Sequence, residues 1–239
     1  YNMRLVIGTA IYTSNTTIST TPIDAVANTR LLLKAIPGVQ DLTGQVSLLT
    51  AGSAEKRITT SKFGNGSIFF DGAADYVTAL ANSASGVADP FGFNTGDFTI
   101  EGWIYTTTVA SGRKTICASR ATATDATTGR FSVYANTANL EFFSASANVV
   151  FGGTISTNTW THFAVTRSSG NVRLFLSGTQ VGSTTSYTAT MPSSVNITIG
   201  DNSAGTESWN GYIDELRITK GYARYVANFT APTVAFLSL

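Results

Sequence analysis

The amino-acid sequence predicts an all-β protein, folded as a sandwich or jelly roll of two antiparallel sheets. The 239 residues include 38 threonines, whose branched β-carbon favours strands. Charged residues make up 12% of the chain, about half of the roughly 25% usual for soluble domains, while 43% are hydrophobic. Short β-rich runs recur about every 8–15 residues with turn-forming residues between them, a pattern typical of sandwiches.

Each predicted strand rests on a local pattern. GSIFFDG and DYVTAL are β-rich runs separated by a Gly-Ala-Ala turn, and both faces of DFTIEGWIYTT carry large apolar groups, as in a strand covered on both sides. Asn-Thr-Ala and Ser-Ser-Gly-Asn each separate two runs and predict hairpins. The strands are expected within 66–72, 75–80, 97–107, 130–135, 139–145, 161–178, 195–202 and 211–219. Residues 24–36 fit a helix or a strand equally well.

The two ends of the sequence repeat each other. Residues 3–20 align without a gap on residues 216–233 over a shared R-x-x-x-G-x-A-x-Y-x-x-N-x-T frame. The identical pairs are Arg4/Arg217, Gly8/Gly221, Ala10/Ala223, Tyr12/Tyr225, Asn15/Asn228, Thr17/Thr230 and Thr20/Thr233. We interpret residues 1–25 as the closing segment of a preceding repeat or an inter-subunit arm, and residues 26–239 as one complete domain.

The chain has a single cysteine and a single histidine, which limits the kinds of metal and catalytic site that it can form. Cys117 is the one cysteine, so the chain forms no internal disulfide and no zinc site built on paired cysteines. His162 is the one histidine, and no G-x-S-x-G turn accompanies it. We therefore expect Cys117 to be a buried hydrophobic residue and His162 to be structural. No stretch approaches the roughly 20 apolar residues of a membrane span, so we expect no membrane insertion.

The charge distribution argues against nucleic acid as a partner. The net charge is +1, whereas duplex-binding proteins carry a strong basic patch. Arg113, Lys114 and Arg120 form the one loose basic cluster, without interleaved aromatic residues.

Four segments, in order, resemble a known family. FGNGSIFFDGAADYV, GDFTIEGWIY, NTWTHFAVTRSSGNVRLFLSG and ITIGDNSAGTESWNGYIDELRITKG look like laminin-G-like members of the concanavalin A-like lectin/glucanase superfamily. The resemblance covers about residues 29–220 and implies a jelly-roll sandwich of two antiparallel sheets. LFLSGTQ departs from it, because the family more often has Asn before the Gly. The closing RITKGYARYVANFTAPT resembles modules common in bacteriophage tail and virion proteins and in large bacterial surface proteins.

The tryptophans are expected in the core rather than at a sugar-binding surface. Trp103 and Trp160 lie in the two longest β patterns, and large buried aromatic residues dominate core energetics. Trp209 stands where the family often carries Phe, so we expect it to be packed as well.

The carboxylates predict a protein without catalytic activity. Hydrolases of the superfamily resemble one another in an E-x-D-x-x-E strand, in which alternation places acid and nucleophile on one face. Glu101 has no carboxylate two or four residues away, and the adjacent Asp214 and Glu215 are expected to point to opposite faces. We therefore expect no glycoside hydrolysis.

Calcium is the one cofactor that the sequence suggests. Asp71 and Asp75 flank the turn in FFDGAADY, and the resemblance places Asp214 nearby, so these three residues are the predicted structural calcium ligands. Alternatively, Asp71 and Asp75 form turn hydrogen bonds, as aspartates commonly do.

Two functions remain open at this stage. The first is a structural or assembly module of a phage virion, tail or surface fibre, with neighbouring copies or other virion or fibre proteins as partners. The second is a carbohydrate-binding adhesin of a secreted or cell-surface protein, which binds a cell-surface glycan through exposed Tyr and Asn side chains that the sequence does not locate. Both imply a virion, extracellular or cell-surface location.

Overall fold

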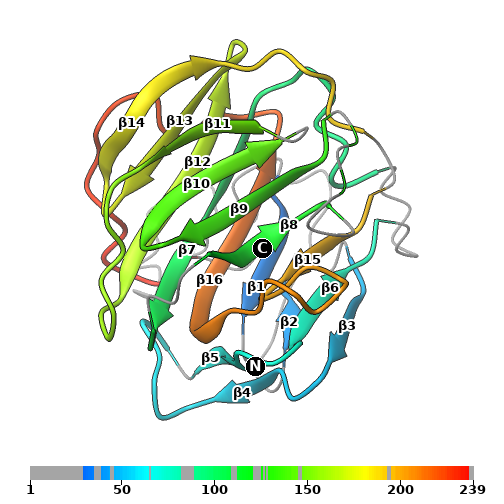
Figure 1. Cartoon of the computed structure of the whole chain (residues 1–239), viewed down its shortest axis with the longest axis vertical. Coiled ribbons are helices and arrows are strands. Elements are labelled where there is room, and N and C mark those ends of the chain that lie inside the picture. Colours follow the sequence, from blue (N-terminus) through cyan, green and yellow to red (C-terminus); the bar gives the residue numbers. More distant parts are fainter. Residues whose placement is uncertain are drawn as a thin grey trace, which may run out of the picture.

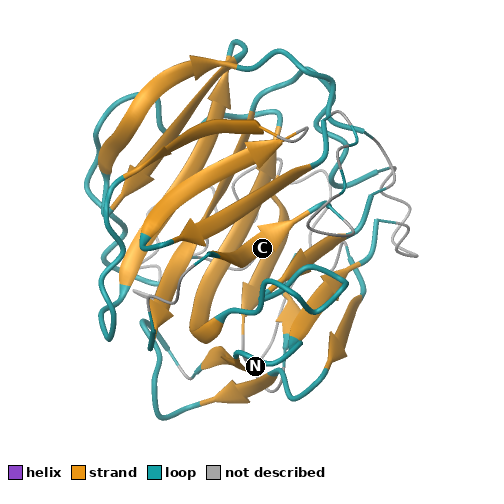
Figure 2. Ribbon diagram, viewed as in Figure 1, coloured by secondary structure: helices purple, strands orange, loops and turns teal. Residues whose placement is uncertain are grey.

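The computed structural model describes residues 29–34, 39–43, 46–64, 66–81, 89–108, 112–120, 125, 127, 129–144, 147–192 and 195–236. These residues form sixteen strands and no helix (Figures 1 and 2). The strands are β1 (Thr29–Lys34), β2 (Gln40–Asp41), β3 (Leu48–Ala51), β4 (Glu55–Arg57), β5 (Ser67–Asp71), β6 (Tyr76–Ala79), β7 (Phe98–Thr106), β8 (Arg113–Ala118), β9 (Phe131–Asn136), β10 (Asn139–Ser144), β11 (Ala147–Gly152), β12 (Thr161–Ser168), β13 (Asn171–Leu176), β14 (Thr179–Ser186), β15 (Ile197–Ile199) and β16 (Asn210–Lys220).

The strands form two antiparallel sheets, which confirms the predicted sandwich. Sheet A has the order β14-β13-β12-β7-β16-β1-β2, with β5 paired to β16 and β4 to β5. Sheet B has the order β11-β10-β9-β8-β15-β6-β3. Strands far apart in sequence are neighbours, above all β7 and β16 at the centre of sheet A. This pairing brings β16, the last strand in the sequence, beside β7.

The core lies between the sheets and follows strand alternation. Phe98, Ile100 and Ile104 of β7 are fully buried in it, while the intervening side chains point to the outer face of sheet A. Gly102 leaves little room for a side chain, because a Cβ there would lie 3.1 Å from the Cα of Leu216 on the neighbouring strand β16. Strand β16 therefore lies close to β7 at this position of sheet A.

Several sequence predictions are confirmed by these elements. The two predicted hairpins are β9–β10 and β12–β13. The ambiguous segment 24–36 contributes strand β1, which pairs with β16. Cys117 is fully buried in the core, and burial raises the pKa of its thiol. Residues 1–25, predicted to be a separate closing segment, lie outside the described residues.

The tryptophan prediction is only partly correct. Trp209 is 1% exposed and packs in the core. Trp103 is buried, but it lies on the outer face of sheet A under Lys62 and Phe63. Trp160 is partly exposed, so its assignment to the core is wrong. It directly precedes β12, at the sheet margin where alternation does not force a side chain inward.

Residues 221–236, here called the C-terminal arm, follow β16 and lie on the outer face of sheet A. The arm contains no strand, yet its backbone is anchored to the sheet: the Gly221 amide donates to Asp97 O at 2.7 Å and the Phe229 amide to Gly178 O at 2.9 Å. No helix that could span a membrane is found in the part of the chain that the structure describes.

Candidate functional site

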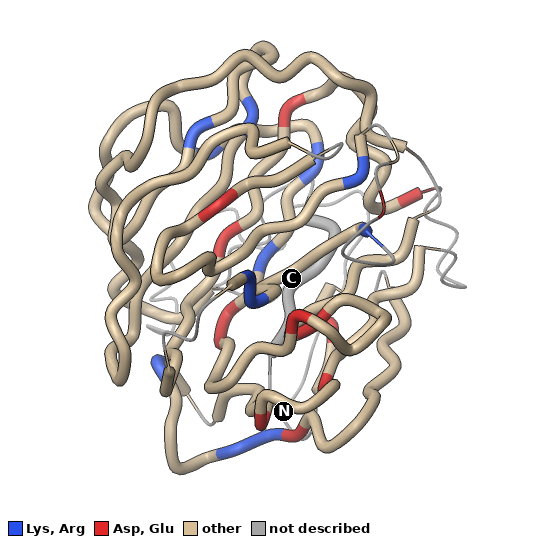
Figure 3. Tube along the Cα trace, viewed as in Figure 1, with Lys and Arg blue, Asp and Glu red and all other residues tan. Residues whose placement is uncertain are grey.

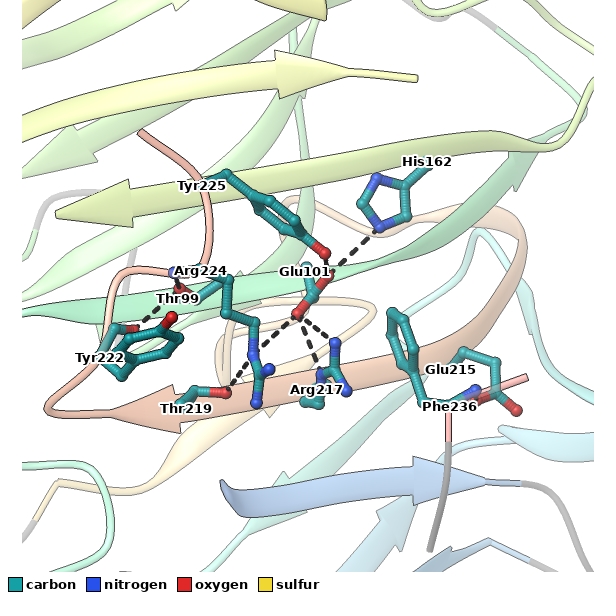
Figure 4. Close-up of polar contacts among 10 residues, drawn as sticks. All are labelled: Thr99, Glu101, His162, Glu215, Arg217, Thr219, Tyr222, Arg224, Tyr225 and Phe236. Atoms are coloured by element: carbon teal, nitrogen blue, oxygen red, sulfur yellow. Dashed lines mark hydrogen bonds and ion pairs between the residues drawn. The ribbon is translucent and has the colours of Figure 1, made fainter. Parts of the chain in front are cut away.

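The outer face of sheet A carries a buried carboxylate beneath the C-terminal arm (Figure 4). Glu101 of β7 is fully buried and accepts hydrogen bonds at Oε1 from Arg217 Nε (3.0 Å) and Nη2 (2.8 Å). The Tyr225 hydroxyl donates to Oε2 at 2.8 Å. Arg224 Nε lies 3.3 Å from Oε1, and His162 Nε2 lies 3.5 Å from Oε2. We call these five residues the Glu101 site.

A β-bulge places Arg217 at this site. Asp214 pairs with Trp103, whereas Arg217 pairs with Glu101, so β16 has one residue more than β7 between these pairs. Glu215, inside the bulge, has a φ of 53°. A bulge shifts the strand alternation by one residue, so both Asp214 and Arg217 reach the outer face. Without it, Arg217 would point toward the core.

Surrounding charges keep the buried carboxyl ionised. Burial alone raises the pKa of Glu101, but the contact with His162, the charge of Arg217 and the hydroxyl of Tyr225 outweigh it and lower that pKa to about 2. Burial and the negative charge of Glu101 raise the pKa of Tyr225. At neutral pH the tyrosine therefore stays a hydrogen-bond donor and the glutamate an acceptor, which suits anchoring rather than proton transfer.

Further contacts fasten the arm along the sheet. Thr99 Oγ1 donates to Tyr222 O at 3.0 Å, and Thr166 Oγ1 donates to Tyr225 O at 2.8 Å. The amide of Gln180 donates to Asn228 Oδ1 at 2.9 Å. These bonds reach β7, β12 and β14, so the arm crosses three elements of sheet A.

Aromatic rings enclose His162 under the arm. Its ring centroid lies 5.3 Å from that of Trp103, 5.8 Å from that of Phe229 and 6.4 Å from that of Phe236. Tyr225 and Phe229 stack with their centroids 3.5 Å apart. The fully buried imidazole thus packs as part of the interface between arm and sheet, as expected for a structural histidine.

The other half of the same face carries a row of partly exposed aromatic rings. Phe69 of β5 pairs with Tyr212 of β16, and Tyr212 pairs with Tyr105 of β7. Trp160, directly before β12, extends the row beyond Tyr105. The successive centroid distances are 5.1, 5.6 and 5.5 Å, and the rings are tilted rather than coplanar. All four are only partly buried. We call them the aromatic row.

Polar groups stand at both ends of the aromatic row. The Arg57 guanidinium lies over the Phe69 ring, 4.8 Å from its centroid. At the other end, the exposed Asn158 accepts a 3.5 Å hydrogen bond from the Tyr105 hydroxyl. The row is therefore an apolar strip with hydrogen-bonding groups along its edges.

A polar cavity lies on the outer face of sheet B. Its volume is about 320 Å³. Its lining is formed by Tyr76, Thr78, Ser119, Arg120, Arg130, Val195, Asn196, Thr198 and Ser203. Part of that lining is already engaged, since Arg120 donates to Asp125 O and to the Tyr134 hydroxyl, both at 2.8 Å.

The three predicted calcium ligands fall in two places. Asp71 and Asp75 lie together, because the Ser53 hydroxyl donates to both and the Asp71 amide donates to Asp75 Oδ2 at 2.9 Å. Asp214 instead accepts from the amides at positions 62 and 63. Within the described residues, no three acidic, histidine or cysteine side chains gather as a metal site. Asp71 and Asp75 make the turn hydrogen bonds of the alternative interpretation, and calcium binding to them stays a prediction.

Charged residues are dispersed rather than gathered in a basic patch (Figure 3). Arg113 forms an ion pair with the buried Glu141 at 2.9 Å, and Arg120 is engaged as described above. Two residues of the predicted basic cluster are thus bound within the protein itself.

The sequence predicts neither the Glu101 site nor the aromatic row on the outer face of sheet A. The sequence indicates Glu101 only as a catalytic candidate, although the repeated frame contains two of its partners, Arg217 and Tyr225. The aromatic row could not be found from sequence, because its rings come from four separate segments that only the pairing register aligns.

Comparisons with known proteins agree with this architecture. A laminin-G-type family model described as "Concanavalin A-like lectin/glucanases superfamily" matches residues 70–224, about two thirds of the chain. No curated protein sequence gives a significant match.

Solved structures share the fold at low sequence identity. Domain 4 of AbnA, an extracellular arabinanase from Geobacillus stearothermophilus solved with arabinotriose, has a TM-score of 0.62 and 18% identity, over 82% of this chain and 94% of that one. The binding domain of botulinum neurotoxin serotype G has a TM-score of 0.56 and 16% identity, over 83% of this chain and 49% of that one. The binding domain of botulinum neurotoxin DC, solved with SialylT, has a TM-score of 0.56 and 14% identity, over 82% and 48%. This chain thus spans about half the length of the neurotoxin chains.

Proposed function

The chain belongs to the concanavalin A-like lectin/glucanases superfamily, and on that basis we propose that it is a carbohydrate-binding domain without catalytic activity. The observation that carries the proposal is the aromatic row of Phe69, Tyr212, Tyr105 and Trp160. A sugar ring has an apolar C–H face and a rim of hydroxyls. It therefore packs against the electron-rich face of an aromatic ring while the rim hydrogen-bonds to polar groups nearby.

The geometry of the row favours a glycan chain over a single sugar. Three rings in register on β5, β16 and β7, followed by Trp160, form a row with centroid spacings of 5.1–5.6 Å. An extended glycan lying across the strands would contact successive rings, and Asn158 and Tyr105 would offer polar contacts at its rim. Two structural neighbours support the ligand class, since one was solved with arabinotriose and another with SialylT.

The absence of catalysis is proposed from the state of Glu101. Glycoside hydrolysis requires two accessible carboxyl groups on either side of the bond to be cleaved. Glu101 is fully buried and ion-paired with Arg217 and Arg224, so no substrate reaches it. Asp214 is 4% exposed and bonded to backbone amides. Because glycans coat cell surfaces and matrices, we place the domain in a secreted or surface-displayed protein.

Calorimetric titration with a panel of soluble polysaccharides, chosen after a glycan array, tests the proposal. We expect one glycan class to bind, and Tyr105→Ala and Tyr212→Ala each to weaken binding about tenfold or more, because each removes one stacking platform. Tyr76→Ala is the matched control, since Tyr76 is also partly exposed but lines the cavity on sheet B. A loss of binding with Tyr76→Ala alone would move the site to that cavity. No binding to any glycan would reject the function.

A second candidate function is an assembly module of a virion, phage tail or surface fibre. The repeat of the arm sequence at positions 3–20 favours it, as do the exposed apolar residues Tyr222 and Val226 on the arm, 52% and 56% exposed. The partners would be neighbouring copies or other fibre proteins. A surface fibre that binds a host glycan would combine both functions.

A further inference from the structure

The cavity on the outer face of sheet B is built from neighbouring strands and the loops at one end of them (Figure 1). Thr78 of β6 and Thr198 of β15 pair with each other and line it. Ser119 and Arg120 directly follow β8, and Arg130 directly precedes β9. The volume of about 320 Å³ is at the lower end of the roughly 300–1,000 Å³ of small-molecule pockets. The cavity therefore has room for one sugar-sized unit rather than for a chain.

Positive charge is part of this lining. Among the described residues that line the cavity are two arginines and no aspartate or glutamate. Arg120 is 2% exposed, and its Nε and Nη1 donate to Asp125 O and to the Tyr134 hydroxyl, both at 2.8 Å. Both of these acceptors are uncharged, so the two bonds hold the guanidinium in place without cancelling its charge.

Arg130 adds a second and more accessible guanidinium. Its side chain is 30% exposed, Nη1 donates to Ser119 O at 3.1 Å, and Nη1 lies 3.6 Å from Asp125 Oδ2. Asp125 thus supplies one negative charge beside two positive ones. Asp201 and Glu207 lie in the loop that contains Ser203, but both are buried, accept hydrogen bonds within that loop and are not part of the lining. The charges at the cavity therefore favour an anion.

Three further side chains of the lining have donors to spare. Asn196 Oδ1 accepts from the Ala81 amide at 2.9 Å, whereas Asn196 Nδ2 makes no hydrogen bond to any residue that the structure describes. The hydroxyls of Tyr76 and Thr78 also make none within the described part of the chain. The cavity thus combines positive charge with several unused donors, the set that an oxyanion and the hydroxyls of a sugar require.

We propose that this cavity binds a single sugar unit that carries an oxyanion, either a carboxylate or a sulfate ester. Arg130 would donate to the oxyanion, because a guanidinium presents several N–H groups in a planar fork that matches such groups. The buried charge of Arg120 would add to the attraction. Asn196 would donate to the oxyanion or to a ring hydroxyl. The proposal goes beyond the proposed function and does not depend on it, since the aromatic row lies on the other sheet.

Calorimetric titration of the full chain tests whether binding requires the charge. The probes are methyl glycosides of glucose and galactose in three forms: neutral, 6-sulfated and oxidised to the uronic acid. We expect one charged form to bind about tenfold or more tightly than its neutral counterpart, and the form that binds identifies the oxyanion. Equal binding of all forms, or binding of none, would overturn the proposal. So would inorganic sulfate that binds as tightly as the sugars, because the cavity would then hold an adventitious ion only.

Two variants with the same change of charge locate the site. Asn196→Asp keeps the oxygen that accepts from the Ala81 amide and replaces the unused donor with a negative oxygen. We expect it to weaken binding of the charged sugar about tenfold or more. Asn158→Asp makes the same change at the end of the aromatic row and should leave that binding unaltered. Equal losses in the two variants, or a loss with Asn158→Asp alone, would overturn the proposal.

A third variant removes a charge from the lining. Arg130→Gln should also weaken binding of the charged sugar about tenfold, and circular dichroism checks its fold. A folded Arg130→Gln that binds as the unaltered chain does would contradict the proposal. If Arg130→Gln fails to fold, Asn196→Asp carries the test, because it keeps the backbone contact. Binding of a neutral glycan to the aromatic row should be the same in all folded variants of the cavity, so this proposal and the proposed function fail separately.

Discussion

The outer face of sheet A has two halves that share strands β7 and β16 and differ in what covers them. Glu101 and Tyr105 stand four residues apart on one face of β7, and Arg217 and Tyr212 stand correspondingly on β16. The C-terminal arm seals the first half, where polar side chains are consumed by internal bonds. The second half remains open with partly exposed rings. The presence or absence of the C-terminal arm therefore distinguishes the covered half of the sheet from the half whose side chains are partly exposed.

The largest expected effect comes from removing the buried carboxylate. Glu101→Ala leaves Arg217 and Arg224 under the arm without their counter-ion, with side chains only 9% and 10% exposed. Breaking a buried ion pair from one side costs about 3–5 kcal/mol. We expect that loss in the free energy of unfolding, measured by urea titration.

A surface ion pair on the same sheet is the matched control. Glu55 pairs with Arg57, but their side chains are 52% and 48% exposed. Exposed pairs contribute about 0–1 kcal/mol, so Glu55→Ala should change stability by no more than that. Equal losses in the two variants would contradict the distinction between a sealed and an open half.

Lowering the pH should reduce the stability that the Glu101 site contributes beneath the C-terminal arm. The pKa of Glu101 is lowered from 4.5 to about 2 in the folded protein. A lowered pKa contributes stability above the unfolded value, and this is lost as the pH falls from about 4.5 through about 2. The loss should be on the order of 3 kcal/mol, seen as a falling urea midpoint. Glu101→Gln, which does not titrate, should flatten this part of the profile; an unchanged slope would assign the acid sensitivity to other carboxyls.

Trimming the open half should affect stability less. Tyr212→Ala removes a partly exposed ring whose neighbours Phe69 and Tyr105 remain packed on either side. We expect a loss of about 1–2 kcal/mol, whereas glycan binding falls about tenfold or more. A loss of stability as large as that of Glu101→Ala would mean that the row is structural and would weaken its assignment as a binding surface.

The sequence predicted the strands better than it predicted the outer face of sheet A. Alternation along 97–107 and the hairpin turns specify local strands, so the all-β sandwich and both hairpins followed directly. The bulge between Asp214 and Arg217 did not, because a positive φ at Glu215 has no signature in its residue type. The predicted divergence of Asp214 and Glu215 assumed regular alternation, which the bulge interrupts. Likewise, Trp160 looked like a core residue because its run is β-rich, although it precedes the strand.

Calcium should give the smallest effect and should act on the open half alone. Asp71 ends β5 two residues after Phe69, so an ion held by Asp71 and Asp75 would brace the turn at one end of the aromatic row. Calcium prefers six to eight oxygen ligands, and both carboxylates already accept hydrogen bonds from backbone amides. Binding should therefore be weak, and millimolar calcium should raise Tm by about 1–2 °C.

Two variants separate the predicted calcium ligands. Asp71→Asn should abolish the rise in Tm, because it halves the charge at the turn. Asp214→Asn should leave the rise intact, because Asp214 is occupied by the amides of Lys62 and Phe63 beside the sealed half. A Tm that responds to neither calcium nor chelator would leave Asp71 and Asp75 with turn hydrogen bonds as their sole role. In that case the open half would owe its shape to strand pairing and side-chain packing alone.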